Sequence, residues 1–355
     1  MALQARNPKH FLTAGYRAVF SLVSGGLAGR VGCPPRRYPG VRAGYPGPAL
    51  SRSPLFCRSP QYSVHRASEG HAQRMDQYRR GDLVFDVIDE GAADAPVVVL
   101  LHGFPQFNTS WNTVIPRLTA RGYRCLAPNQ RGYSRGARPM RRRDYRVPEL
   151  VEDVRALIDA SGAQRVHLVG YDWGATVAWA VAAEIPERLG SLTTMSVPHP
   201  AAFLKAMATS RQALASWYIY FFQLPRIPER YFLDREGNAS RLSKFMQSMA
   251  KQSAEAADRD ARAMAEPGVL TAGLNWYRAI PLTDLRGVGE KITVPTMYVW
   301  SDGDTALLEK GARNTGRYVS GDYRFETLHG SHWMLDEQPD AVADLLLEWL
   351  AAHPI

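Results

Sequence analysis

The sequence predicts an α/β fold in which a mostly parallel central sheet is flanked by helices and interrupted by a helical insertion. Three observations predict it. Strand-like and helix-like segments alternate after Met75, which is typical of parallel strands joined by helical crossovers. The segment GYDWG (residues 170–174) lies at a junction between a strand and a helix. Between about residues 199 and 283, a helical and aromatic pattern replaces the strand pattern.

Apolar runs define the expected strands. Residues 96–101 (PVVVLL) are continuously apolar, as expected for a central strand that is covered on both faces. The predicted strands are 82–90, 96–101, 123–128, 165–169, 294–300 and 323–328. The sheet should therefore form from both halves of the chain.

Helices are expected where apolar residues recur at helical spacing or where helix formers accumulate. Residues 148–160 and 339–352 show this spacing, and residues 173–184 are rich in alanine. The helical insertion then divides the folded part into a core of residues 75–198 and 284–355 and a cap of residues 199–283.

Residues 1–74 are expected to form a disordered basic tail. Up to Ser68 the chain holds ten of its 43 basic residues and no acidic residue, and its Pro-, Gly- and Arg-rich sequence lacks periodicity. Three interpretations stay open: a start codon assigned too far upstream with Met75 as the true start, an organellar targeting segment, or a functional arm. The other 33 basic and 34 acidic residues nearly balance, so the globular part is not expected to bind nucleic acid.

Composition also argues against several other classes of protein. Three cysteines without a CxxC pair argue against a disulfide framework and against a thiolate zinc site. They favour a reduced, cytoplasmic protein, unless the tail directs the chain to an organelle. The best apolar run, residues 18–29, is short and glycine-rich, whereas a membrane span needs roughly 20 residues. The sequence contains no phosphate-loop, metal-cluster or dinucleotide motif, so we expect neither a cofactor nor a metal. It does not predict the oligomeric state.

The first candidate catalytic residue is Asp172, in the middle of GYDWG. Small residues at both ends of this turn allow a sharp bend, which would expose the aspartate at the carboxyl edge of the sheet. This arrangement is that of a nucleophile elbow. The alternative is an aspartate that merely caps the following helix.

Five motifs, in this order, resemble the α/β-hydrolase superfamily, and within it the epoxide hydrolases and haloalkane dehalogenases that use an aspartate nucleophile. They are HGFP (102–105), NQRGYS (129–134), GYDWG (170–174), WSDGD (300–304) and GSHW (330–333). Each is weak alone, but their combination is specific and covers the chain from Asp82 onward. The resemblance implies an α/β-hydrolase fold with a cap.

The chemistry of a carboxylate nucleophile defines what the other residues must do. An aspartate has an ordinary pKa of about 3.9, so Asp172 can attack an sp³ carbon without a base and form an ester. Hydrolysis of that ester needs a base, which the resemblance places at His332, oriented by Asp304 with Asp302 as the alternative. The implied oxyanion donors are the backbone N–H groups of Phe104 and Trp173.

The leaving group distinguishes epoxide hydrolysis from dehalogenation. An epoxide oxygen leaves as an alkoxide that needs a proton donor, whereas a halide does not. Tyr218 and Tyr277 match the lid tyrosines of epoxide hydrolases. Tyr220 is a second candidate for the position of Tyr218, and the alternative role for all three tyrosines is aromatic packing within the cap. Phe104 stands where many dehalogenases have asparagine, which favours epoxides.

The resulting expectation is an epoxide hydrolase that converts a small-molecule epoxide to a vicinal diol through an aspartyl ester. The alternatives are a haloalkane or haloacid dehalogenase on the same Asp-His-Asp scaffold and a catalytically silent, ligand-binding α/β-hydrolase.

Overall fold

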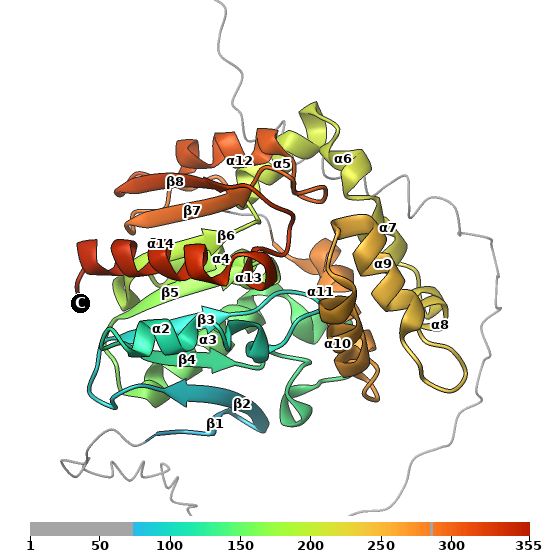
Figure 1. The fold of residues 1–355 in the computed structure, drawn as a ribbon, viewed down its shortest axis with the longest axis horizontal. Coiled ribbons are helices and arrows are strands. Elements are labelled where there is room, and N and C mark those ends of the chain that lie inside the picture. Colours follow the sequence, from blue (N-terminus) through green and yellow to red (C-terminus); the bar gives the residue numbers. More distant parts are fainter. Residues whose placement is uncertain (1–73, 285–286) are drawn as a thin grey trace, which may run out of the picture.

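The computed structural model describes residues 74–284 and 287–355. The predicted basic tail, residues 1–74, lies outside the described residues except for Arg74. Within the described ranges, helices cover both faces of one sheet and a group of further helices lies at one end of it (Figure 1). None of the helices described is long and apolar enough to cross a bilayer.

The sheet has eight strands in the order β1-β2-β4-β3-β5-β6-β7-β8. The strands are β1 (Gln77–Arg80), β2 (Leu83–Glu90), β3 (Val97–Leu101), β4 (Arg124–Pro128), β5 (Val166–Tyr171), β6 (Leu189–Met195), β7 (Thr296–Ser301) and β8 (Tyr323–Leu328). The pairs β1–β2 and β2–β4 are antiparallel, and all other pairs are parallel. The mostly parallel sheet is therefore confirmed.

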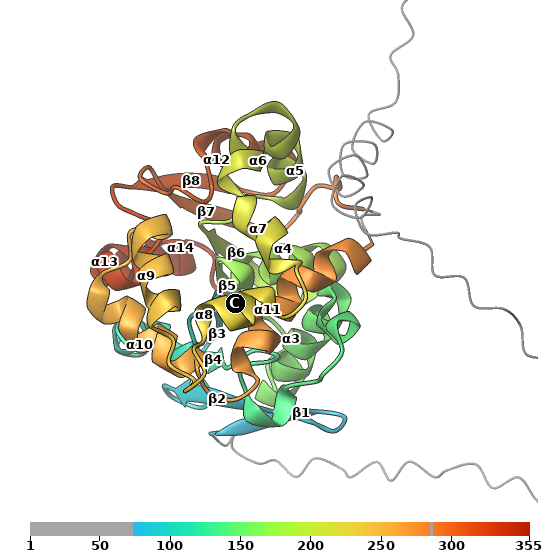
Figure 2. The ribbon, with the colours of Figure 1, turned by 90° about the vertical axis from the view of Figure 1, so that its right-hand side faces the viewer.

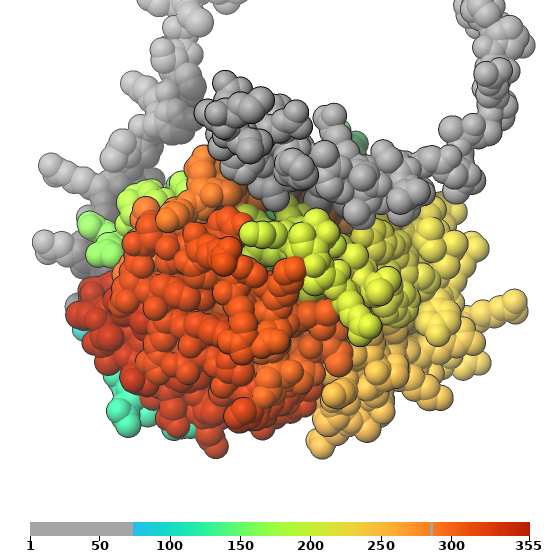
Figure 3. Space-filling model, turned by 90° about the horizontal axis from the view of Figure 1, so that it is seen from above, coloured from blue at the N-terminus to red at the C-terminus, as the bar shows by residue number. Residues whose placement is uncertain are grey.

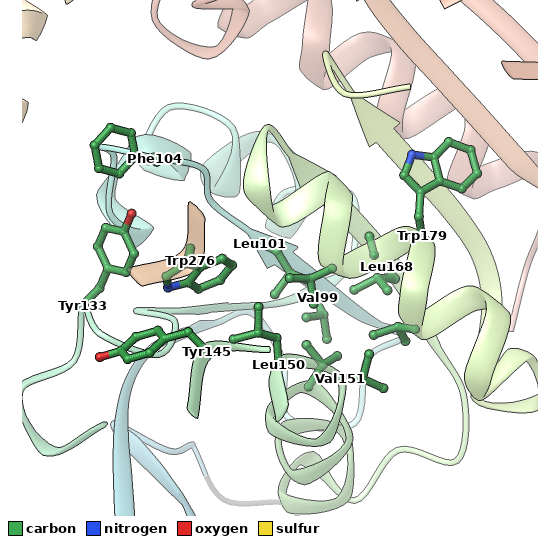
Figure 4. Close-up of a cluster of buried hydrophobic side chains, with 14 of the residues drawn as sticks. Val99, Leu101, Phe104, Tyr133, Tyr145, Leu150, Val151, Leu168, Trp179 and Trp276 are labelled. Carbon is green, nitrogen blue, oxygen red and sulfur yellow. The ribbon is translucent and has the colours of Figure 1, made fainter. Parts of the chain in front are cut away.

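Strand β3 shows why a continuous apolar run was needed at the centre of the sheet. Val97, Val99 and Leu101 point into one hydrophobic cluster, whereas Val98 and Leu100 point into the other. Successive side chains of a strand face opposite sides, so both faces of β3 require apolar residues. Figure 4 shows part of the first cluster, which extends from Val99 and Leu101 to Phe104 and to Trp276, a residue of the helical insertion.

The flanking helices supply the rest of both clusters. Residues of α3 (Val147–Ser161) and α4 (Trp173–Glu184) pack in the first cluster, and residues of α2 (Ile115–Thr119) and α14 (Pro339–Ala352) pack in the second. Two short helices, α12 (Glu309–Asn314) and α13 (Met334–Glu337), follow β7 and β8. The predicted boundaries of α4 and α14 are confirmed, and those of α3 differ by one residue at each end.

Between β6 and β7 the chain leaves the sheet and forms a helical insertion. Its helices are α5 (Pro200–Thr209), α6 (Gln212–Ala215), α7 (Trp217–Phe222), α8 (Ile227–Phe232), α9 (Ser240–Ala250), α10 (Ala254–Met264) and α11 (Val269–Ala279). They lie at the end of the sheet where the parallel strands finish (Figures 1 and 2). Figure 3 shows the insertion packed beside the C-terminal part of the chain. The division into core and cap domains stays a prediction.

Candidate active site

A sharp turn between β5 and α4 presents Asp172. Its φ of 51° is unusual for a residue with a side chain, and close contacts on both sides of the turn require glycine. A Cβ atom on Gly170 would lie 2.3 Å from the Gly174 oxygen, and one on Gly174 would lie 2.2 Å from the Leu101 oxygen. Asp172 occupies the first position before α4 but accepts no capping hydrogen bond from that helix. The interpretation of Asp172 as a simple helix cap is therefore wrong.

The Asp172 carboxylate faces two other predicted site residues. Its Oδ1 accepts a hydrogen bond of 2.8 Å from the backbone N–H of Phe104, and its Oδ2 lies 3.6 Å from His332 Nε2. Trp173 follows directly and begins α4, so its backbone N–H belongs to the same turn. The structure thus brings the predicted nucleophile, base and first oxyanion donor together.

The other ring nitrogen of His332 meets a buried carboxylate. His332 Nδ1 lies 2.7 Å from Asp304 Oδ2, and both side chains are buried. The alternative acid, Asp302, points away and pairs with His329 at the surface, where the Asp302 side chain is 44% exposed. The structure therefore places Asp304, and not Asp302, behind the histidine.

Asp304 has further partners that the sequence did not reveal. Its Oδ1 accepts hydrogen bonds from the N–H groups of Ala306 and Leu307, at 2.8 and 2.9 Å. The Ser196 hydroxyl donates to its Oδ2 at 2.9 Å and also lies 2.9 Å from His332 Nδ1. The one available signal for Ser196 was its place just after β6, the strand next to the one that carries Asp172.

The charges at this site determine the proton on His332. Burial alone would lower the pKa of the ring, but Asp304 and Asp172 raise it to about 10. Burial would raise the pKa of Asp304, yet His332 and the backbone donors hold it below the usual value. Both acids therefore favour the protonated form of His332 in the free site.

A cavity of about 350 Å³ opens above Asp172. Its lining includes Asp172 and Trp173 from the elbow and Tyr218 and Tyr277 from the insertion. From there it follows one face of α4, where the lining residues are Thr176, Ala180, Ala183 and Glu184. Their spacing of three and four residues is that of a single helix face. This volume lies within the usual range of small-molecule sites, and its walls are mostly apolar.

The two lid tyrosines lie side by side in the lining of the cavity. The ring centroids of Tyr218 and Tyr277 are 6.1 Å apart, and the Tyr277 ring is 5.0 Å from that of Trp173. Burial raises the pKa of both phenols, and the charge of Asp172 raises it further, so both remain protonated donors. The rival Tyr220 is only half-buried and does not line the cavity.

No group of three or more histidine, cysteine or acidic side chains that could hold a metal ion occurs in residues 74–284 and 287–355. The residues that line the cavity supply carboxylate, phenol and indole groups.

The order of the strands, the elbow at Asp172 and the Asp172–His332–Asp304 arrangement together define a class of protein. Residues 96–339 match the α/β-hydrolase fold family, and the chain belongs to that family. It is 36% identical over 272 residues to the AB hydrolase superfamily protein YfhM of Bacillus subtilis, covering 76% of this chain and 94% of the relative. It is 32% identical to epoxide hydrolase A of Mycobacterium tuberculosis, covering 74% and 93%.

A solved structure shows the same architecture. The crystal structure of epoxide hydrolase A from Mycobacterium thermoresistibile matches with a TM-score of 0.67 and 25% identity, covering 79% of this chain and 98% of that one. The α/β-hydrolase fold expected from the five motifs is thereby confirmed.

Proposed function

We propose that this protein is a hydrolase that opens epoxides to vicinal diols through a covalent ester on Asp172. One observation carries the proposal: two buried phenols, Tyr218 and Tyr277, line the same cavity as a carboxylate nucleophile backed by His332. The similarity to several epoxide hydrolases supports the same activity. The apolar walls along α4 favour a substrate with an apolar substituent.

In the first step, an Asp172 oxygen attacks a ring carbon of the epoxide. The new C–O bond forms as the ring C–O bond breaks, and the departing oxygen takes a proton from Tyr218 or Tyr277. A halide would leave without that proton, so the phenols would be idle in a dehalogenase. This step requires the carboxylate and the phenols, but it does not require a base.

In the second step, water attacks the carboxyl carbon of the ester. His332 takes a proton from this water, and the N–H groups of Phe104 and Trp173 stabilise the oxyanion. The intermediate then collapses: the departing alkoxide of the diol takes the remaining proton of the attacking water, and the Asp172 carboxylate is regenerated. The hydrogen bond from Phe104 to Asp172 Oδ1 already has the direction that this oxyanion needs.

The two steps are coupled through the charge of Asp172. Ester formation neutralises one of the two carboxylates that hold the proton on His332. The pKa of His332 must then fall, so the ring can give its proton to the tyrosinate that the first step left and then act as a base. Thus His332 becomes a base at the stage where hydrolysis requires one.

Rapid quenching followed by intact-mass analysis tests the proposal with a panel of epoxides and haloalkanes. We expect a mass increase equal to the epoxide, mapped to the peptide that contains Asp172, and a larger labelled fraction of the protein in His332→Gln. Labelling by haloalkanes alone would establish the dehalogenase alternative. Binding of a ligand without any adduct would establish the catalytically silent alternative, and an adduct elsewhere would refute the assigned nucleophile.

A further inference from the structure

We infer that the helical insertion holds the hydrolytic part of the site in place through two polar attachments, in addition to supplying the lid tyrosines. This inference rests on the proposed function. One attachment joins α6 to the loop that carries Asp304, and the other joins α10 to the segments that follow Phe104 and His332. We call these the α6 attachment and the α10 attachment.

The α6 attachment consists of one buried amide. Gln212 is 1% exposed, donates a 2.6 Å hydrogen bond to the Ala306 oxygen and accepts one of 2.8 Å from the Leu308 N–H. The N–H of the same Ala306 donates to Asp304 Oδ1. Gln212 therefore fixes the backbone segment that in turn fixes the acid of the predicted triad.

The α10 attachment centres on Asp336 in α13. Arg259 forms two hydrogen bonds with its neighbour Asp260, at 2.8 and 3.1 Å, and a third of 3.0 Å with Asp336 Oδ1. Asp336 Oδ2 accepts hydrogen bonds from Gln106, at 2.9 Å, and from Gln252, at 3.3 Å. Both glutamines are buried. One carboxylate thus joins three separate segments of the chain.

The core segments held in this way belong to the second chemical step. Asp336 lies four residues after His332, and Gln106 lies two residues after the oxyanion donor Phe104. The Asp172 carboxylate also meets the N–H of Phe104, but its backbone is held by the glycine contacts of the elbow within the core. Loss of the α10 attachment should therefore disturb ester hydrolysis more than attack on the epoxide.

The attachment acts through position, and its ion pair contributes little to global stability. The Arg259 side chain is 47% exposed and that of Asp336 is 17% exposed, and ion pairs this open to solvent contribute little to folding. A shift of about 1 Å in a catalytic group, however, can slow a reaction by about 10²-fold. Asp336 and Gln212 are accordingly positioning residues.

The test uses Asp336→Asn in the full chain, with an epoxide that labels the unaltered protein. This change keeps the shape of Asp336 and leaves the Arg259–Asp260 pair intact. Single-turnover measurements should show ester hydrolysis slowed by about 10-fold or more and ester formation changed by less than about 3-fold, so that the ester accumulates. Gln212→Leu, which removes the other attachment, should shift the balance of the two steps in the same direction.

Asp340→Asn is the matched control, because Asp340 is 88% exposed on α14 and pairs with Arg117 instead of the insertion. It should leave both steps unchanged, and thermal unfolding should confirm that the variants remain folded. Equal slowing of both steps, or unaltered hydrolysis in both Asp336→Asn and Gln212→Leu, would overturn the inference. Absence of any ester in the unaltered protein would instead contradict the proposed function.

Discussion

The proposed coupling between the two steps predicts that the pKa of His332 depends on the charge of Asp172. Asp172→Asn replaces the carboxylate with a neutral amide of the same shape, and so imitates the charge of the ester. Of the two carboxylates that raise this pKa to about 10, Asp304 then remains. We therefore expect the pKa of His332 to fall in this variant.

The distance between the two groups sets the size of the effect. His332 Nε2 lies 3.6 Å from Asp172 Oδ2. Two unit charges about 4 Å apart interact by about 4 kcal/mol at an effective dielectric constant of about 20. Since about 1.4 kcal/mol corresponds to one pH unit, the pKa should fall by about two to three pH units, toward neutrality. The histidine would then lose its proton near neutral pH, where the free site retains it.

An NMR titration of the histidine ring measures this directly, with the His332 signals identified by their loss in His332→Gln. Intact mass at the end of the titration should confirm that the amide has not hydrolysed. Asp302→Asn is the control, because Asp302 pairs with His329 at the surface and should not affect His332. An unchanged or raised pKa of His332 in Asp172→Asn would refute the coupling.

Three further predictions follow from the cavity and the tail. Tyr218→Phe and Tyr277→Phe should each slow ester formation by roughly 10²-fold, whereas the control Tyr220→Phe should not; equal rates in all three would contradict the role of the phenols. Ala180→Trp should narrow the cavity along α4, and kcat/KM should fall for epoxydodecane but not for epoxybutane; equal losses would show that this wall does not contact the substituent. Removal of the residues before Met75 should leave the midpoint of thermal unfolding and the turnover rate unchanged, and a large decrease in either would assign the tail a role.

Local patterns in the sequence were sufficient to predict most of the sheet. A continuous apolar run identified β3, and helical spacing identified α3 and α14. Burial of both faces of a strand, or of one side of a helix, requires a pattern of apolar residues that can be recognised in the sequence. Strand β1 was not predicted, since its four residues, QYRR, show no apolar pattern. It forms a strand because it pairs with β2.

The polar parts of the site were predictable only where a motif marks them. The order of motifs led to Asp172 and His332, and the family pattern favoured Asp304 over Asp302. The alternative stayed open because only the turn after β7 decides which carboxylate faces inward. Ser196 and Gln212 carry no motif, and their partners lie 108 and 94 residues away. Such contacts arise from tertiary packing and leave no local signal.

The place where the insertion joins the sheet has a consequence for how this protein can change. The insertion leaves after β6 and returns at β7, and these two strands are hydrogen-bonded neighbours, with Leu192 opposite Thr296. Evolution or design could therefore exchange the whole insertion, and with it the walls of the cavity, without breaking a strand pair of the sheet. The replacement helices would still have to supply hydrogen-bond partners for Asp336 and for the backbone between Ala306 and Leu308. The same insertion would thus determine both the range of substrates and the efficiency of ester hydrolysis.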